Sequence, residues 1–257
     1  MKVHYGVDVV NDSPVLRLAG AELYDEKTVV EQLPFTVSIA RSDEQLRKAV
    51  TIRHAAYARH VPALAELMKA PEPCDRDDGV VLLLAESKLD GSPLGTMRIE
   101  TNRYRPLALE QSVELPDWLQ GCSLAGASRL GVALGRVGRV VKTVLFKAYF
   151  RYCEQVGVDW MVIAARSPLD RQYEALLFRD VFPEQGFIPL RHASNIPHRV
   201  LAFEVDTAED RWSAAHHPLF DFVFRTHHPD LDLRRATPFY GAVTQPGIPV
   251  YGTKGAQ

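Results

Sequence analysis

One long amphipathic segment between two short apolar segments constrains the fold more than any other feature of the chain. Apolar residues recur with helical spacing over residues 137–156, and Gly157 follows as a residue typical of helix ends. Sequence typical of buried strands stands on both sides, at residues 128–132 and at residues 160–165 (WMVIAA). This order and spacing predict a crossover unit in which a helix connects two parallel strands.

The other periodic segments predict a mixed α/β (α+β) fold with a largely antiparallel central sheet. Further strands are expected at 35–40, 80–87, 95–101 and 200–205, and the Asp90-Gly91 pair indicates a hairpin between the second and third of these. Ser42 is a typical N-cap, with Gln45 three residues later, and opens a helix that runs through Tyr57. Two more helices are expected, at 170–181 and 208–226.

These elements divide the chain into three parts. Residues 1–34 form an N-terminal arm or an edge hairpin, residues 35–205 form the main domain, and residues 206–257 form a helical extension with a tail rich in proline and glycine. In the extension, the apolar side chains of residues 212–224 are expected to pack on the core. Two other roles stay open, the wall of an acyl-chain tunnel and contact with a membrane surface.

Composition excludes several classes of function. The formal net charge of −2 gives no general attraction to nucleic acid or to anionic membranes. The N-terminus lacks the layout of a signal peptide, and the densest apolar run, 80–85, is too short to span a bilayer, so we expect a cytoplasmic protein. The spacing of Cys74, Cys122 and Cys153 predicts reduced thiols. The histidine pairs at 216–217 and 227–228 do not have a zinc-binding spacing, so no metal is expected.

The segment from Gly131 to Arg139 links a strand to the long helix and carries the clearest chemistry. Glycines allow the backbone to approach a ligand closely, and the N-terminus of a helix attracts phosphate. Arg136 and Arg139 add guanidinium groups that suit phosphate oxygens. The pattern predicts a phosphate-binding loop, although it is not the nucleotide-binding loop GxxxxGK[ST]. A glycine loop that opens a helix with a solvated basic face is the alternative interpretation.

The order of these elements resembles the core of the GCN5-related N-acetyltransferase (GNAT) superfamily. The order is a strand, the glycine and arginine loop, the long helix, the WMVIAA strand, a helix and the QGF motif at 185–187. The resemblance implies a fold in which two parallel strands, here 128–132 and 160–165, splay apart. The pantetheine arm of an acyl donor lies between them. The resemblance also implies which residues bind that donor: Leu130, Gly131, Val132, Arg136, Gly138 and Arg139.

Four short motifs carry a narrower resemblance. They are Arg53-x-x-x-Tyr57, Asp75-x-x-Asp78, Gly95-x-x-Arg98 and Ser128-Arg129-Leu130, in this order. Together they are similar to motifs of the autoinducer (acyl-homoserine lactone) synthases and, more closely, of the bacterial long-chain N-acyl amino acid synthases, which the segment 216–233 also resembles. Gly126 stands where autoinducer synthases have a glutamate, and the tryptophan usual after their first helix is absent.

The narrower resemblance implies the acceptor pocket. Substrate-binding residues would be Arg53, Tyr57, Asp75, Arg98 and Ser128, and catalytic residues Asp78, Glu100, Arg129 and Tyr173. Asp78, Glu100 or a water chain would accept the proton of the amine, and a backbone N–H of the strand 128–132 would stabilise the oxyanion. Tyr173 would protonate the leaving thiolate, or would simply pack in the core. Surface ion pairs are the alternative interpretation of the charged residues.

The expected function is therefore transfer of an acyl group, long-chain by resemblance, from acyl carrier protein or acyl-CoA to the amine of an amino acid or similar small amine. No tightly bound cofactor is implied, because the acyl-phosphopantetheine donor is a substrate. An acidic carrier protein would dock on Arg136, Arg139, Lys142 and Lys147. Two alternatives stay open, an acetyl-CoA-dependent N-acetyltransferase and a non-catalytic GNAT-like domain that binds an acyl ligand.

Overall fold

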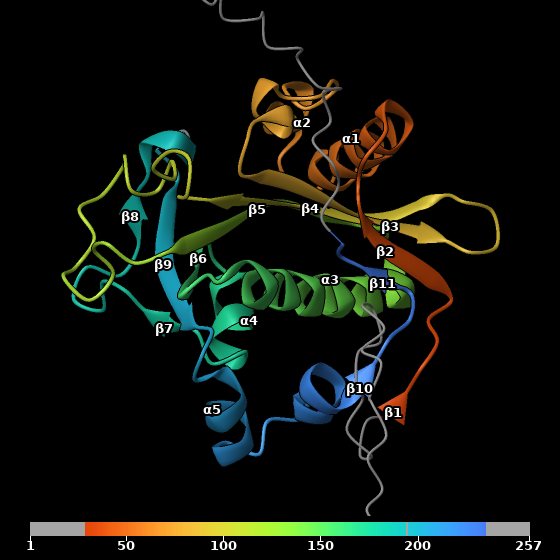
Figure 1. Cartoon of the computed structure of the whole chain (residues 1–257). Coiled ribbons are helices and arrows are strands. Elements are labelled where there is room, and N and C mark those ends of the chain that lie inside the picture. The colour runs from red at the N-terminus through yellow and green to blue at the C-terminus, as the bar shows by residue number, and fades with distance from the viewer. Residues whose placement is uncertain (1–28, 194, 235–257) are drawn as a thin grey trace, which may run out of the picture.

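A mixed sheet separates an upper helical layer from a lower one in the computed structural model, which describes residues 29–193 and 195–234 (Figure 1). The main strand order is β11-β2-β3-β4-β5-β6-β9-β7, and β8 pairs with β9. The strands are β2 Phe35–Ile39, β3 Val80–Ser87, β4 Pro93–Thr101, β5 Leu124–Val132, β6 Trp160–Ala165, β7 Arg179–Asp180, β8 Ile188–Pro189, β9 Pro197–Glu204 and β11 Leu231–Asp232. Within this sheet, β5 with β6 and β2 with β11 are the parallel pairs, so the expected mixed, mostly antiparallel sheet is confirmed.

The upper layer contains α1 (Asp43–Ala58), α2 (Pro62–Glu66) and the 3₁₀ turn η1 (Pro73–Arg76). Ser42 caps α1 by accepting a hydrogen bond from the Gln45 N–H at 3.2 Å, as its sequence predicts. Apolar residues of α1 and β3 form a small core between this helix and the sheet. Beside it, the connection from β4 to β5 covers β6 and β9 with a second apolar cluster that includes Leu107 and Leu119.

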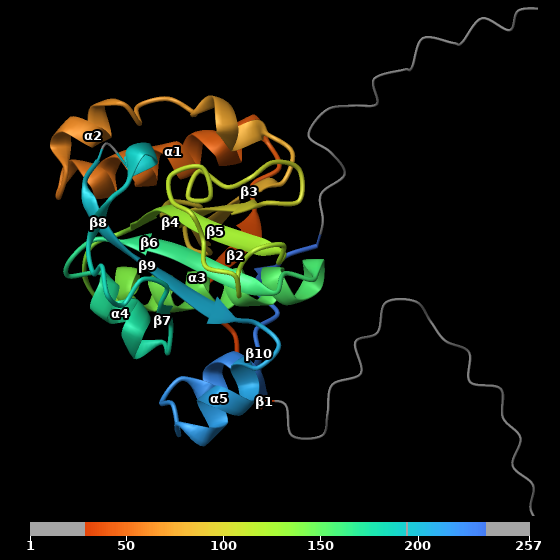
Figure 2. The same ribbon diagram turned by 90° about the vertical axis from the view of Figure 1, so that its left-hand side faces the viewer.

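The lower layer is dominated by α3 (Gly135–Val156), which crosses from β5 to β6 (Figures 1 and 2). Its residues Val141, Val144, Leu145 and Ala148 are completely buried against the sheet. Burying a valine or leucine side chain contributes about 1.5–3 kcal/mol, so this face holds the helix under the strands. Gly157 ends the helix with a φ of 69°, as the sequence predicts.

Two predicted helices are shorter than expected. The helix expected over 170–181 ends as α4 (Asp170–Ala175), because Leu177 takes a left-handed φ of 65° and Phe178 turns into the core before β7. The helix expected over 208–226 is α5 (Ala208–Ala214), followed by a separate π-helical turn, η3 (Asp221–Arg225). Pro218 accounts for that break, since proline disfavours helical conformation in the residue before it.

The segment after residue 205 returns to the main sheet. β11 pairs with β2, and β10 (Thr226–His227) pairs in parallel with β1 (Val29–Val30). The rest of the expected N-terminal arm, residues 1–28, and the tail, 235–257, lie outside the described residues. The predicted boundary at residue 205 stays a prediction. The extension that follows it supplies β11, a strand of the same sheet.

The apolar side chains of the extension pack on the core under α3. Trp212 is 1% exposed, its ring stacks on Phe146 of α3, and Phe220, Phe222 and Phe224 pack against the same cluster. Their packing confirms the expected core role of residues 212–224. No helix in the described part of the chain combines the length and apolarity needed to cross a membrane.

Candidate functional site

The two parallel strands of the sheet separate along their length. β5 and β6 pair at Leu124 with Trp160, at Ala125 with Met161 and at Gly126 with Val162, whereas β5 continues along β4 as far as Val132. The Tyr149 hydroxyl of α3 donates a hydrogen bond to the Ala125 carbonyl oxygen at 2.5 Å, next to the last of these pairs. The expected splayed strands are therefore present, and the opening lies beyond Gly126.

A β-bulge in β5 marks the start of this opening. The pairing of β4 with β5 shifts between Thr96 and Arg98, so that Met97 faces two residues, Arg129 and Leu130. Arg129 takes a φ of 56°, which a non-glycine residue rarely adopts. The bulge places both Ser128 and Arg129 on the upper face, where Ser128 bonds Arg98 and Arg129 bonds Glu72.

Beneath α1, the upper face carries a buried ion cluster. Arg53 of α1 is completely buried and donates two hydrogen bonds to Asp75, from Nη1 to Oδ1 at 3.1 Å and from Nη2 to Oδ2 at 2.8 Å. Arg98 of β4 lies beside them, with Nη1 3.2 Å from Asp75 Oδ1 and Nε 2.8 Å from Glu100 Oε1. These bonds bring together side chains from α1, η1 and β4.

Glu72 completes the cluster, and its role was not predicted from the sequence. Arg129 donates to both of its carboxylate oxygens, from Nε and from Nη2, each at 2.8 Å. Arg98 Nη1 also donates to Glu72 Oε2 at 3.1 Å. Glu72 lies three residues before Asp75, and its backbone carbonyl oxygen accepts a hydrogen bond from the Asp75 N–H. This capping pattern at η1 is the sequence signal that could have identified Glu72.

Two carboxylates of this cluster, those of Glu72 and Asp75, are held in their charged form. Burial raises the pKa of Glu72, but the hydrogen bonds and charge of Arg129 outweigh burial and leave that pKa below its ordinary value. Burial likewise raises the pKa of Asp75, and Arg53 reverses the change. Cys74 differs, since burial raises the pKa of its thiol although Arg98 lies 2.9 Å from the sulfur. Glu72 and Asp75 are thus ionised at neutral pH, with the protonated thiol of Cys74 beside them.

Two tyrosines lie around the opening between the strands. Tyr57 of α1 is half-buried, and burial raises the pKa of its phenol although guanidinium groups oppose the rise. Those groups belong to Arg129, Arg98, Arg166 and Arg53. Tyr173 of α4 packs edge-on against Phe178, and burial, helped by Tyr57, raises its pKa to about 12. Tyr173 is therefore a partly buried member of the core whose hydroxyl keeps its proton.

The glycine and arginine segment forms the turn from β5 into α3. Gly135 takes a φ of 82°, and a Cβ on Gly138 would lie 1.8 Å from the Ala133 carbonyl oxygen. Only glycine allows this tight start to the helix. Leu134, the N-cap residue, gives no side-chain hydrogen bond, so the N–H groups of the first turn remain open to a ligand. Arg136 and Arg139 are exposed beside them.

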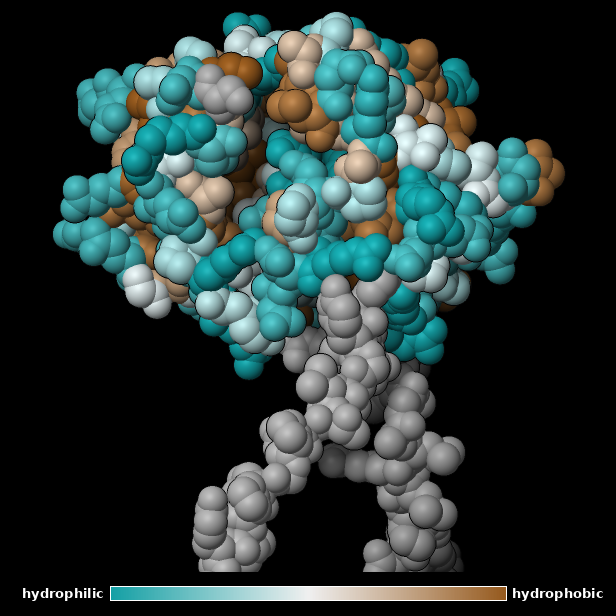
Figure 3. Space-filling view, turned by 90° about the horizontal axis from the view of Figure 1, so that it is seen from above, coloured by the Kyte–Doolittle hydropathy of each residue, from teal (hydrophilic) through white to brown (hydrophobic). Residues whose placement is uncertain are grey.

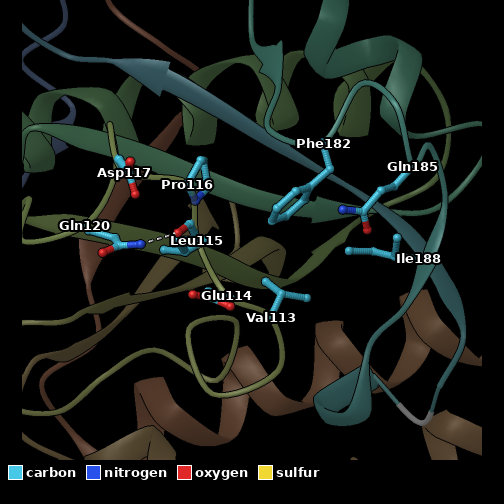
Figure 4. A pocket seen from close by; sticks show the side chains of 9 residues that line it. All are labelled: Val113, Glu114, Leu115, Pro116, Asp117, Gln120, Phe182, Gln185 and Ile188. Atoms are coloured by element: carbon cyan, nitrogen blue, oxygen red, sulfur yellow. Dashed lines mark hydrogen bonds between the residues drawn. The ribbon is translucent and has the colours of Figure 1, made fainter.

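The upper face is hollowed between the region of α1 and the connection from β4 to β5, and hydrophobic residues lie in the depth of the hollow (Figure 3). A second cavity, of about 470 Å³, lies on the outer side of that connection. Figure 4 shows its lining, which includes Glu114, Phe182 and Ile188 and shares no residue with the ion cluster. This outer cavity is therefore separate from the ion cluster.

No family model and no curated protein matches the sequence, but solved structures match the fold. FeeM, an N-acyl amino acid synthase from uncultured soil microbes, matches with a TM-score of 0.56 and 17% identity, over 73% of this chain and 97% of FeeM. BjaI, a CoA-dependent acyl-homoserine lactone synthase, gives a TM-score of 0.49 and 15% identity, over 76% and 93% of the two chains. The chain has the GNAT fold.

Most of the predicted acceptor residues meet in one place on this GNAT fold. Arg53, Asp75, Arg98 and Ser128 share the ion cluster, together with the predicted catalytic residue Arg129. Tyr57 lies within electrostatic range of all three arginines. Gly131 packs closely on α1, where a Cβ would lie 3.1 Å from the Arg53 Cα.

Asp78, like Tyr173, does not join the cluster. It is exposed at the turn before β3, and none of the ion pairs described here includes it. Glu100 lies in the cluster, bound to Arg98, and stands directly opposite Gly126 in the β4–β5 register. A carboxylate of β4 therefore lies beside Gly126 on the neighbouring strand.

Other basic residues of α3 lie apart from the glycine loop. Lys147 was expected on an exposed docking face, but it is 2% exposed under the C-terminal extension, where Nζ bonds the carbonyl oxygens of Phe222 and Thr226. Lys142 bonds Gln172 Oε1 at 2.5 Å. Of the four basic residues of the predicted docking face, Arg136 and Arg139 remain the exposed pair.

Leu130 and Val132 point to the lower face and pack against the main core, as partly buried residues of β5. Their backbone, rather than their side chains, is what a ligand in the strand opening can reach. Among the described residues, no three histidine, cysteine, aspartate or glutamate side chains gather as a metal-binding group.

Proposed function

We propose that the protein is a cytoplasmic N-acyltransferase. It transfers a long-chain acyl group from acyl carrier protein or acyl-CoA to the amine of an amino acid or a similar small amine. The observation that carries the proposal is the opening between β5 and β6, which has the start of α3 at one side and the buried ion cluster at the other. The N-acyl amino acid synthase activity of FeeM, whose fold is similar, supports it.

The donor side is the start of α3. The pantetheine arm would enter the opening beside the backbone of Leu130, Gly131 and Val132. Its phosphate would meet the free N–H groups of the first helical turn, with Arg136 and Arg139 beside it. Leu134, Val137 and Val140 are 72%, 48% and 43% exposed on the same turns. An apolar patch with two arginines suits the surface of an acidic carrier protein.

The acceptor side is the ion cluster. Three guanidinium groups, of Arg53, Arg98 and Arg129, face three carboxylates, of Glu72, Asp75 and Glu100. Arg166 adds a further positive charge near Tyr57, so the region has an excess of cations. An acceptor that carries a carboxylate would bind to this excess, and Arg129, which already binds a carboxylate through two bonds, is the group suited to it.

The reaction needs an oxyanion donor and a path for protons. The bulge at Arg129 and Leu130 leaves β5 with one residue more than β4, so a backbone N–H there can point into the opening. Tyr173 or Tyr57 would give a proton to the departing thiolate, since the pKa of each phenol is raised and each is protonated at neutral pH.

Product analysis tests the proposal. The purified protein is incubated with a mixture of amino acids and, in separate reactions, with palmitoyl-acyl carrier protein, palmitoyl-CoA or acetyl-CoA, and the products are identified by mass spectrometry. An N-palmitoyl amino acid, lost in Arg129→Ala and retained in Arg47→Ala, is the expected result. N-acetyl products alone would favour the acetyltransferase alternative, and donor binding without any product would favour the non-catalytic domain.

A further inference from the structure

A histidine outside all the motifs described above lies in a short turn on the upper face of the sheet. His192 belongs to the 3₁₀ turn η2 (Arg191–Ala193), which precedes β9 on the upper face, across the strand opening from α1 and α2 (Figure 1). Its Nδ1 lies 2.8 Å from the hydroxyl oxygen of Ser112, a residue 80 positions earlier in the connection between β4 and β5. Two segments distant in sequence therefore orient this imidazole.

The bond to Ser112 determines which ring nitrogen carries the proton. The Ser112 hydroxyl donates its single proton to the Ala108 carbonyl oxygen, at 2.8 Å. Toward His192 it can therefore act only as an acceptor, so Nδ1 must be the protonated nitrogen. In a neutral imidazole the lone pair then lies on Nε2, which is the nitrogen left for a ligand.

The surroundings of His192 favour the neutral ring. Partial burial lowers the pKa of His192, although solvent still reaches the side chain, and the charge of His198 on β9 lowers that pKa further. Glu100 of β4 raises the pKa by a smaller amount, and Arg129, with the smallest of these effects, lowers it. Glu100 and Arg129 belong to the ion cluster, so the imidazole lies within electrostatic range of the predicted acceptor pocket while its side chain stays exposed.

We propose that Nε2 of His192 is the general base of the acyl transfer, an inference that rests on the proposed function. The ammonium group of the acceptor gives one proton to Nε2, which passes it to water. The neutral nitrogen attacks the thioester carbonyl carbon, the C–N bond forms and the C–S bond breaks. The second proton that the nitrogen loses ends on the departing thiolate. Ser112 is a positioning residue, because it acts only through the imidazole.

The other residues considered for this role are less suited to it. Glu100 is already engaged by Arg98, whose Nε lies 2.8 Å from Glu100 Oε1. Asp78 is exposed outside the cluster. His198 is directed elsewhere, since its Nδ1 lies 2.7 Å from the Ile196 carbonyl oxygen.

The test compares His192→Ala with His198→Ala, in the full-length protein with palmitoyl donor and amino acid acceptor. His192→Ala is expected to lower kcat by about 100- to 10,000-fold, the range usual for loss of a general base, and added imidazole is expected to restore part of it. His198→Ala is expected to retain kcat. In the wild type, kcat/KM is expected to fall as the pH is lowered, with a midpoint below pH 6.5, the ordinary pKa of histidine. Ser112→Ala is expected to move the pH of that midpoint.

A second readout does not depend on activity. Nitrogen-15 NMR of the histidine rings is expected to show His192 protonated at Nδ1 in the wild type and mixed between the two nitrogens in Ser112→Ala. If the wild type is active and His192→Ala keeps its full kcat and the same fall of kcat/KM at low pH, the general-base role is wrong but the proposed function stands. A wild type that forms no N-acyl product from any donor would overturn the proposed function and the base role together.

Discussion

Arg53 and Asp75, 22 residues apart, form a two-bond ion pair in which both side chains are 0% exposed. A charge buried this fully is costly unless an opposite charge lies beside it, because water cannot reach the group to solvate it. The pair joins α1 to η1, and through Arg98 and Glu72 it is continuous with Arg129 of β5. It is therefore both a fold contact and a support of the candidate site.

Asp75→Ala is expected to lower the free energy of unfolding by about 3–5 kcal/mol, because the buried Arg53 loses both hydrogen bonds to Asp75 and keeps the longer contact with Glu72, at 3.4 Å. Urea denaturation followed by circular dichroism measures the change. Asp78→Ala is the matched control, since Asp78 is exposed in the same segment, and its effect is expected to stay within about 0.5 kcal/mol. Equal effects of the two variants would contradict the assignment of the buried pair.

Gly138→Ala is expected to disturb the start of α3, because the new Cβ would lie 1.8 Å from the Ala133 carbonyl oxygen and the loop would have to move. Overpacking of this kind costs about 1–3 kcal/mol of stability. We also expect weaker binding of acyl-CoA, measured by calorimetry, because the N–H groups of the first turn are displaced. Val140→Ala, a change at a 43% exposed position of the same helix, is expected to leave both quantities unchanged.

Arg136→Glu combined with Arg139→Glu is expected to lower kcat/KM for acyl carrier protein at least tenfold, since each arginine lost from a charged contact removes roughly 1.5–3 kcal/mol. The difference from the wild type is expected to shrink as salt is added. The control pair, Arg47→Glu with Arg103→Glu, changes net charge equally at exposed positions outside the α3 turn. If the control pair loses as much activity, the effect reflects net charge rather than the docking surface.

Lys147 is expected to make stability depend on pH. Burial, assisted by the charge of Arg151, lowers the pKa of Lys147 from 10.5 to about 7 in the folded protein. Between these values the unfolded chain binds a proton that the folded chain does not, so the free energy of unfolding rises from pH 7 toward pH 10.5. Denaturation midpoints measured across this range are expected to rise in the wild type and to flatten in Lys147→Met.

The geometry around Lys147 fits a neutral amine. A neutral Nζ has two N–H groups for the carbonyl oxygens of Phe222 and Thr226, and a lone pair for the Nδ1–H of His228, 2.9 Å away. Burial, with the charge of Lys147, lowers the pKa of His228 to about 4, so this ring must also gain a proton when the chain unfolds below pH 6.5. A stability that fell between pH 7 and 10 would contradict a neutral lysine at this position.

The sequence by itself determined the crossover unit around α3, the bounds of β3 and the start of α1. These depend on local signals: helical spacing of apolar residues, an unbroken apolar strand and a capping serine. It also determined that the turn at Gly135 and Gly138 must be tight, because glycine is the residue that such a turn requires. The motif residues Arg53, Asp75, Arg98 and Arg129 were identified through family resemblance.

Only the tertiary structure decided which charges meet. Glu72 joins Arg129 across 57 positions, and Ser112 orients His192 across 80, and neither contact has a periodic pattern in the sequence. The structure also decided that Lys147 is buried whereas Arg136 on the same helix is exposed, because the C-terminal extension covers one part of α3 and not the other. Local signals specify the conformation of a segment, but the packing of distant segments sets the burial and partners of each charge, and these decide its chemistry.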